Sequence, residues 1–154
     1  MTLRQLLHAV EVTASNQPAV EMIVRSDVFR LNAAPDAKYG VFAWLQGQHS
    51  VAPYGSLNTY RFTFFYVDRL TADKSNETEV QSTGIEVLTN IVRALENQGI
   101  ECPDRLSFQA FNQRFSDECA GVFCTVALEV PSGDTCPEGY ADFNQDFNED
   151  FMIW

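Results

Sequence analysis

Residues 57–70 read LNTYRFTFFYVDRL and contain the strongest strand pattern in this chain of 154 residues. Bulky side chains occupy both alternating sets of positions: Tyr60, Phe62, Phe64 and Tyr66 on one side, and Arg61, Thr63, Phe65 and Val67 on the other. Aromatic and β-branched residues favour strands, and a strand that is bulky on both faces belongs in the middle of a sheet. We therefore predict a central strand that is covered on at least one face.

A long amphipathic helix is predicted after this strand, over residues 77–97. Apolar or small residues recur along one stripe at Val80, Gly84, Val87, Leu88, Ile91 and Leu95. Asn76 is placed to cap the first turn, Glu79 stands at the capping-box position, and Gly99 supplies the residue beyond the end. The polar loop 71–75 connects the strand to this helix.

The remaining patterns predict one more helix and four more strands. Thr2 and Gln5 match a capping box before a helix over residues 3–15, which ends ahead of Pro18. Strands are expected at residues 20–31, with a turn or bulge at 25–27, and at residues 41–46, 106–115 and 121–130. In the last strand the inward residues are Val122, Cys124, Val126, Leu128 and Val130, and residues 116–120 form the preceding hairpin connection.

These elements predict an α+β fold, in which a mainly antiparallel β-sheet is flanked by two helices. Their order is α-β-β-β-α-β-β, and short connections between neighbouring elements favour this closure. The length is that of one domain, which we assign to residues 1–131. Residues 132–154 do not fit the core pattern and are assigned to an extended, acidic and aromatic C-terminal arm.

The charge of the chain is concentrated at its C-terminal end. The net charge is −11, and residues 115–154 contain nine acidic residues and no Lys or Arg. Nucleic-acid binding depends on clustered Lys and Arg, so we expect no tight DNA binding by the single chain. No apolar run approaches the roughly 20 residues of a membrane span, and no secretory signal is evident, which predicts a soluble protein made in a cytoplasm.

Motifs for catalysis, cofactors or metals are missing from the sequence. It contains no phosphate-binding glycine loop and no hydrolase elbow, and its cysteines at 102, 119, 124 and 136 form no Cys-x-x-Cys pair. Cys124 is expected to be a buried thiol, while a disulfide of Cys119 or Cys136 stays open. His8 and His49 are expected on a helix flank and in a loop. We therefore predict a protein that is not an enzyme and has no cofactor and no metal site.

The arm carries a repeat in which an Asp-Phe pair recurs every four residues. The repeated residues are Asp142, Phe143, Asp146, Phe147, Asp150 and Phe151, and Tyr140 and Trp154 extend the aromatic content. A calcium loop of the EF-hand type is excluded because its sixth and twelfth positions are not Gly and Glu. We interpret the arm as a docking segment that orders in a groove of another subunit. The alternative is that it folds back on its own sheet.

The passage FFYVDRLTADKSNE at residues 64–77, continued through QSTGI at 81–85 to Leu95, resembles virion proteins of tailed phages. The likeness is greatest to the neck and tail ring proteins of crAss-like and related phages, and it covers about residues 57–130. The order of elements is also similar to the tail-terminator and tail-completion fold. In that fold a helix-flanked antiparallel sheet assembles into rings between portal and tail.

The resemblance implies a structural virion protein that assembles in the bacterial host. It would form a homo-oligomeric ring of sixfold or twelvefold symmetry in the head-to-tail connector, the neck or the upper tail. Its neighbours would be the portal and other neck or tail proteins, with genome DNA passing through the lumen without tight binding and with no membrane partner. The C-terminal arm has no counterpart in the tail-terminator pattern.

A second candidate interface is the loop after the central strand, where Arg69, Asp73 and Lys74 carry alternating charges. We expect these charges to pair between subunits, while the alternative is a solvated turn that caps its helix through Asn76. The competing function is a small intracellular binding adaptor that uses the acidic aromatic tail to engage a basic partner.

Overall fold

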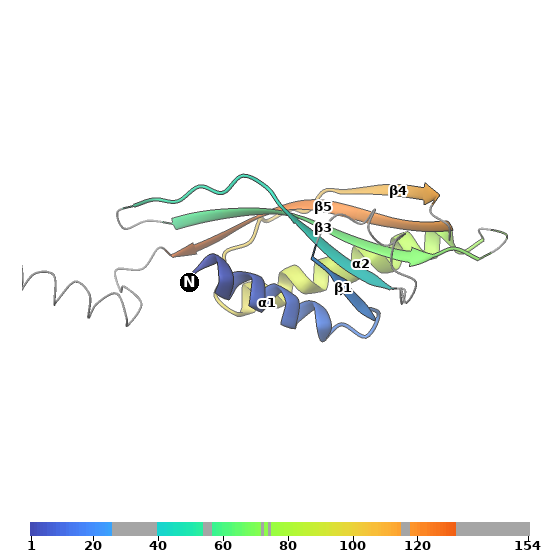
Figure 1. Ribbon diagram of the computed structural model, residues 1–154, viewed down its shortest axis with the longest axis horizontal. Coiled ribbons are helices and arrows are strands. Elements are labelled where there is room, and N and C mark those ends of the chain that lie inside the picture. Colours follow the sequence, from blue (N-terminus) through green and yellow to red (C-terminus); the bar gives the residue numbers. More distant parts are fainter. Residues whose placement is uncertain (26–39, 54–56, 72, 74, 115–117, 132–154) are drawn as a thin grey trace, which may run out of the picture.

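The computed structural model describes residues 1–25, 40–53, 57–71, 73, 75–114 and 118–131. In this part of the chain the helices are α1 (Leu3–Ser15) and α2 (Glu77–Asn97). The strands are β1 (Met22–Val24), β2 (Val41–Gln46), β3 (Leu57–Arg69), β4 (Phe108–Arg114) and β5 (Glu118–Pro131) (Figure 1). The predicted α+β class and the order of its elements are confirmed.

The strands form one five-stranded sheet in the order β1-β2-β3-β5-β4. Strand β1 pairs with β2 in parallel, and all the other neighbours are antiparallel. The predicted central strand is confirmed, because β3 pairs with β2 on one side and with β5 along its whole length on the other. The long β3–β5 ribbon makes the molecule elongated (Figure 1).

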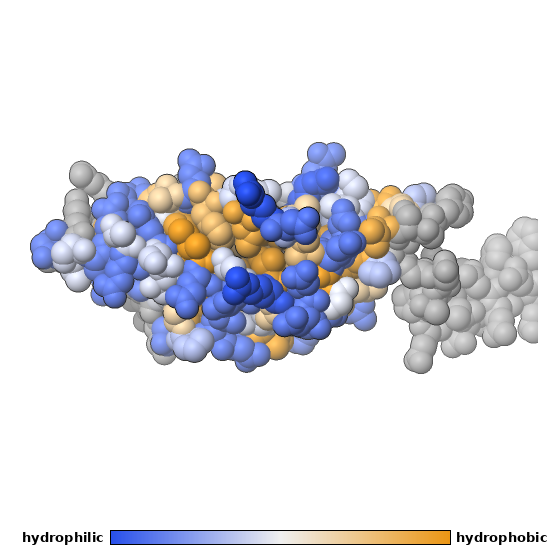
Figure 2. Space-filling view, turned by 180° about the vertical axis from the view of Figure 1, so that it is seen from behind, coloured by the Kyte–Doolittle hydropathy of each residue, from blue (hydrophilic) through white to orange (hydrophobic). Residues whose placement is uncertain are grey.

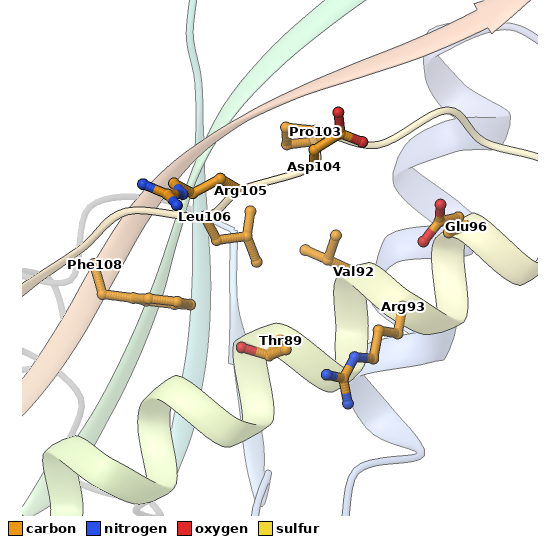
Figure 3. Close-up of a pocket in the computed structure, with 9 residues that line it drawn as sticks. All are labelled: Thr89, Val92, Arg93, Glu96, Pro103, Asp104, Arg105, Leu106 and Phe108. Carbon is orange, nitrogen blue, oxygen red and sulfur yellow. The ribbon is translucent and has the colours of Figure 1, made fainter.

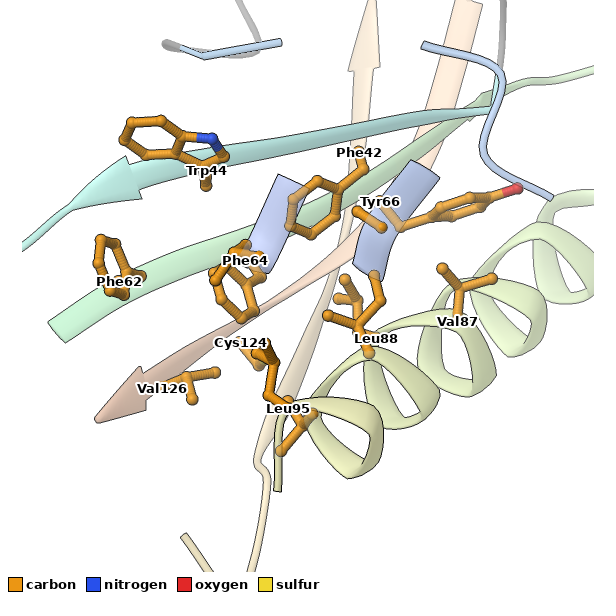
Figure 4. Packing of buried hydrophobic residues seen from close by; sticks show 14 of the residues in the cluster. Phe42, Trp44, Phe62, Phe64, Tyr66, Val87, Leu88, Leu95, Cys124 and Val126 are labelled. Carbon is orange, nitrogen blue, oxygen red and sulfur yellow. The ribbon is translucent and has the colours of Figure 1, made fainter. Parts of the chain in front are cut away.

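Both helices pack on the same face of the sheet and enclose the main core. Side chains of α1 and α2 meet the alternating aromatic residues of β2 and β3 there, and the inward residues of β5 complete the layer (Figure 4). Helix α2 lies very close to the sheet at Gly84, where a Cβ atom would be 2.7 Å from Val122 Cγ2 and 2.9 Å from Tyr66 Cδ1. A glycine in the helical stripe therefore marks the contact between helix and sheet.

Local signals at the helix ends are confirmed for Thr2 with Gln5 and for Gly99, and they are wrong for the capping of α2 by Asn76 with Glu79. Thr2 and Gln5 form the predicted capping box, with bonds of 2.8 and 3.2 Å, and Gly99 has the positive φ of 86° expected beyond a helix end. Helix α2 has the predicted bounds. However, the Asn76 side chain makes no capping bond to α2, because it binds the preceding loop instead.

Several strand predictions differ in extent from the structure. Within the predicted strand at 20–31, Met22–Val24 is a strand, residues 20, 21 and 25 are not, and residues 26–31 lie outside the described part. The predicted strand at 106–115 is observed as Phe108–Arg114. Residues 118–120 belong to β5 rather than to a hairpin connection. No helix among the described residues is long and apolar enough to cross a membrane.

Candidate interaction surfaces

The loop between β3 and α2 forms a compact turn around Asp73. Asp73 Oδ1 accepts hydrogen bonds from Thr71 Oγ1 at 2.7 Å, Ser75 Oγ at 2.9 Å and the Ser75 backbone N–H at 3.2 Å. These bonds favour the charged carboxylate and lower the pKa of Asp73 from 3.8 to about 2, with the Thr71 hydroxyl as the largest cause. Asp73 therefore holds the turn together while its charge stays exposed.

Asn76 closes the same turn from the helix side. Its Oδ1 accepts a bond from the Thr71 backbone N–H at 2.8 Å, and its Nδ2 donates to the Arg69 carbonyl oxygen at 3.2 Å. The structure thus places two predicted interface residues, Arg69 and Asp73, within one self-bonded turn. The third, Lys74, lies outside the described residues.

The predicted arm residues, Tyr140, Asp142, Phe143, Asp146, Phe147, Asp150, Phe151 and Trp154, also lie outside the described residues. The described chain stops at Pro131, which pairs with Leu57 at the end of the β3–β5 ribbon. The arm therefore follows directly from one end of the sheet.

An aromatic cluster lies on the sheet face opposite the helices. Phe65, Phe111 and Phe123 come from β3, β4 and β5, and their ring centroids are 5.6 to 6.3 Å apart. All three rings are half-buried, and Phe65 and Phe111 pack against a small second core in which Val41 and Cys119 are fully buried. We call Phe65, Phe111 and Phe123 the outer aromatic cluster.

The outer aromatic cluster continues to a strand edge. Strand β4 is the last strand of the sheet, and among the described residues its backbone pairs only with β5. Its sequence FQAFNQR contains no Pro and no Lys, which are common protections of edge strands. Ala110 and Asn112 on this edge are exposed. An aromatic face therefore meets, at Phe111, a strand edge that is left open by the described residues.

A groove of about 470 Å³ lies between α2 and the segment that leads into β4. Helix α2 contributes Thr89, Val92, Arg93 and Glu96, and the segment contributes Pro103, Asp104, Arg105, Leu106 and Phe108 (Figure 3). We call it the α2–β4 groove. Val92 is buried, and the half-buried Leu106 and Phe108 pack against the main core. These three side chains point toward one another and form an apolar floor (Figure 3).

The charged residues of the α2–β4 groove stand on its rims. Arg93 lies on the helix side and Arg105 on the opposite side, whereas Glu96 and Asp104 lie toward the Pro103 end (Figure 3). Within the described part of the chain the ion pair is Arg25 with Glu11 at 2.7 Å, so neither groove arginine has a carboxylate partner there.

Seen from behind, the molecule shows hydrophobic residues gathered in its middle, between hydrophilic ones (Figure 2).

Burial suppresses the ionisation of the Cys102 and Cys124 thiols. Burial raises the pKa of the Cys124 thiol to about 12, and burial with the Glu96 charge raises that of Cys102 to about 11. Both thiols therefore stay protonated at neutral pH, and the predicted burial of Cys124 is confirmed. Cys119 is buried, and Cys136 lies outside the described residues, so the disulfide left open for these cysteines stays open.

The two histidines occupy different settings. His8 is exposed on α1, as predicted. His49 lies 5.2 Å from the ring of Tyr60, its Nδ1 accepts the Arg61 backbone N–H at 3.2 Å, and its Nε2 bonds Gln46 Oε1 at 2.9 Å. This histidine therefore fastens its loop to β3. In the described ranges no three His, Cys, Asp or Glu side chains are grouped as metal ligands.

Neither the outer aromatic cluster nor the α2–β4 groove was predicted from the sequence. Phe65 was recognised as bulky on the second face of its strand, but its neighbours Phe111 and Phe123 follow from the register of three strands. The α2–β4 groove lies between a helix and residues 103–108, and no periodicity within either segment indicates that the two lie side by side. In comparison with known proteins, no family model and no curated protein matches the chain.

Proposed function

We propose that this chain is a structural virion protein of a tailed bacteriophage. It forms an oligomeric ring in the head-to-tail connector, the neck or the upper tail, and the genome passes through this ring. The observation that supports the proposal is the joining of the outer aromatic cluster to the open β4 edge. Aromatic residues concentrate at protein interfaces, and an open strand edge offers backbone donors and acceptors to another chain.

Ring closure requires that each subunit present two different surfaces to its two neighbours. Identical subunits joined head to tail close into a ring when the rotation between them fits. The outer aromatic cluster with the β4 edge provides one such surface. The C-terminal arm, which follows Pro131 at the far end of the β3–β5 ribbon, is a separate contact of different chemistry and requires a receiving surface of its own on the neighbour.

The mass of the purified full-length chain tests the proposal directly. Native mass spectrometry and analytical ultracentrifugation should find a closed oligomer, with six or twelve copies, and negative-stain microscopy should show rings. Adding candidate portal or neck proteins should give a stacked complex if the ring needs a neighbour to form. If the chain stays monomeric both alone and with these proteins, the proposed ring is contradicted. The alternative function, a small binding adaptor, is then favoured.

A further inference from the structure

The α2–β4 groove has the chemistry that an acidic aromatic segment requires. Val92, Leu106 and Phe108 offer an apolar floor, and Arg93 and Arg105 stand on opposite rims without a carboxylate partner among the described residues. We propose that this groove is the docking site for the C-terminal arm, residues 132–154, of a neighbouring copy of the chain. The inference rests on the proposed ring, and it names the surface that receives the arm.

The sequence of the arm is complementary to the apolar floor and the charged rims of the α2–β4 groove. Phe143, Phe147 and Phe151 are four residues apart, which places them on one stripe when the segment is helical. An Asp precedes each of these phenylalanines, and the arm has no Lys or Arg. Phenylalanines on the floor therefore bring carboxylates toward the rims, where Arg93 and Arg105 are exposed. Charge-assisted hydrogen bonds between guanidinium and carboxylate are among the stronger polar contacts.

The acidic end of the groove sets the direction in which the arm lies. Glu96 and Asp104 stand near Pro103, and they repel a carboxylate that is placed beside them. The Asp residues of the arm are therefore confined to the part of the groove near Arg93 and Arg105. Like charges placed against each other disfavour a wrong register, so the rim residues limit the registers in which the arm can dock.

The path of the chain favours the groove of a neighbour. Glu101 bridges to Glu129 of β5, with backbone bonds of 2.9 and 3.0 Å, and the groove begins two residues later at Pro103. Strand β5 continues from Glu129 to Pro131. This is the direction away from Cys124, which pairs with Phe108 at the other end of the groove. To enter its own groove, the chain would have to reverse its direction after Pro131, whereas the groove of another copy requires no such reversal. Its 23 residues span up to roughly 75 Å when extended, which is enough to reach another copy.

A labelled peptide of residues 132–154 tests the contact independently of ring formation. The receiver is the full-length chain with Phe143, Phe147 and Phe151 replaced by Ser, so that its own arm does not compete. Fluorescence anisotropy should show saturable binding of the peptide. Adding Arg93→Glu and Arg105→Glu to the receiver should weaken binding by about tenfold or more, since each buried or rim charge pair contributes to affinity.

The matched control adds Arg4→Glu and Arg61→Glu to the same receiver. Both residues are exposed and lie outside the groove, and the change in net charge is the same. This control should bind the peptide as the receiver does. Equal weakening in both variants means that the peptide senses only total charge, which overturns the docking site.

Mixing two full-length variants identifies which copy supplies the arm. One variant has the reversed groove arginines and an intact arm, and the other has the Ser-substituted arm and an intact groove. Each alone should self-associate weakly, whereas the mixture should form a mixed oligomer in native mass spectrometry. Peptide binding without any mixed oligomer means that the arm occupies its own groove, which overturns the neighbour as its source. If wild-type rings form and the peptide does not bind, the groove inference fails while the proposed ring stands.

Discussion

The ring of Phe111 lies against Gly121 of the adjacent strand: a Cβ atom at position 121 would come within 2.9 Å of Phe111 Cζ. The same Cβ would also collide with the carbonyl oxygen of Tyr66 in β3. Gly121 therefore lets the β3–β5 ribbon close and lets one ring of the outer aromatic cluster lie flat on the sheet. Because a backbone oxygen cannot move away as a flexible side chain can, this position has no room for a side chain.

Gly121→Ala is accordingly expected to destabilise the fold by about 1–3 kcal/mol, the usual cost of overpacking a tight site. Urea unfolding followed by circular dichroism measures the change. Gly99→Ala is the comparison, because nothing lies within 4 Å of the Cβ that it adds, so any loss of stability there comes from the positive φ of 86° and not from a collision. A free energy of unfolding that is unchanged in Gly121→Ala would contradict the observed packing.

Phe111 also provides a test of the outer aromatic cluster as an interface. Phe111→Ala removes two ring contacts, of 6.3 and 6.1 Å between centroids, from a half-buried site. We expect the oligomer to weaken by about 2 kcal/mol or more, as for truncated aromatic residues at the centre of interfaces. Sedimentation over a concentration series measures this loss. Gln109→Ala, on the same strand and face, is the control and should leave association unchanged.

The stability of the monomer separates this result from simple unfolding. Phe111 is only half-buried, so its truncation should cost less than the roughly 3–5 kcal/mol of a fully buried phenylalanine. An oligomer that keeps its mass while the monomer loses stability would assign Phe111 to packing within the subunit and not to an interface.

Asp73 makes the β3–α2 turn sensitive to acid. Its pKa in the folded chain is lowered to about 2 from 3.8, so the stability that it contributes is fully present above pH 4 and is lost as the pH falls toward 2. Carbon-detected NMR titration of the carboxyl group measures this pKa. Thr71→Val removes the 2.7 Å hydroxyl bond and should raise the pKa of Asp73 toward its ordinary value. A titration midpoint that does not move in this variant would contradict the assigned cause.

Local sequence signals predicted the helices and the central strand well, because the forces involved act within a few residues. The Thr2–Gln5 capping box and the apolar stripe of α2 depend on neighbours three or four positions away, and both are confirmed. The alternation in β3 placed it centrally because both of its faces had to be covered. Asn76 was misjudged because two partners compete for its side chain, and the Thr71 N–H binds it in place of the helix.

The surfaces could not be predicted because they depend on strand register and on contacts between distant segments. The Phe65–Phe123 pair exists only because β3 and β5 align these residues, and a shift by one residue would turn one ring to the helix face. Arg93 and Arg105 are twelve residues apart and come to line opposite sides of the α2–β4 groove only after α2 packs on the sheet. The pattern of the arm is visible in sequence, but its partner surface is not.

The arm itself provides the last prediction, which compares two adjacent residues. Phe147→Ala removes an aromatic ring that docking would bury, and Asp146→Ala removes a carboxylate at the rim of the same contact. Truncating a buried interface aromatic costs about 2 kcal/mol or more, whereas an exposed ion pair contributes about 0.2–1 kcal/mol. Phe147→Ala should therefore weaken the oligomer more than Asp146→Ala, and raising the salt concentration should have a smaller effect than losing the ring. Sedimentation of both variants at low and high salt measures the difference. If Asp146→Ala has the larger effect and salt abolishes association, charge and not aromatic burial holds the arm in place.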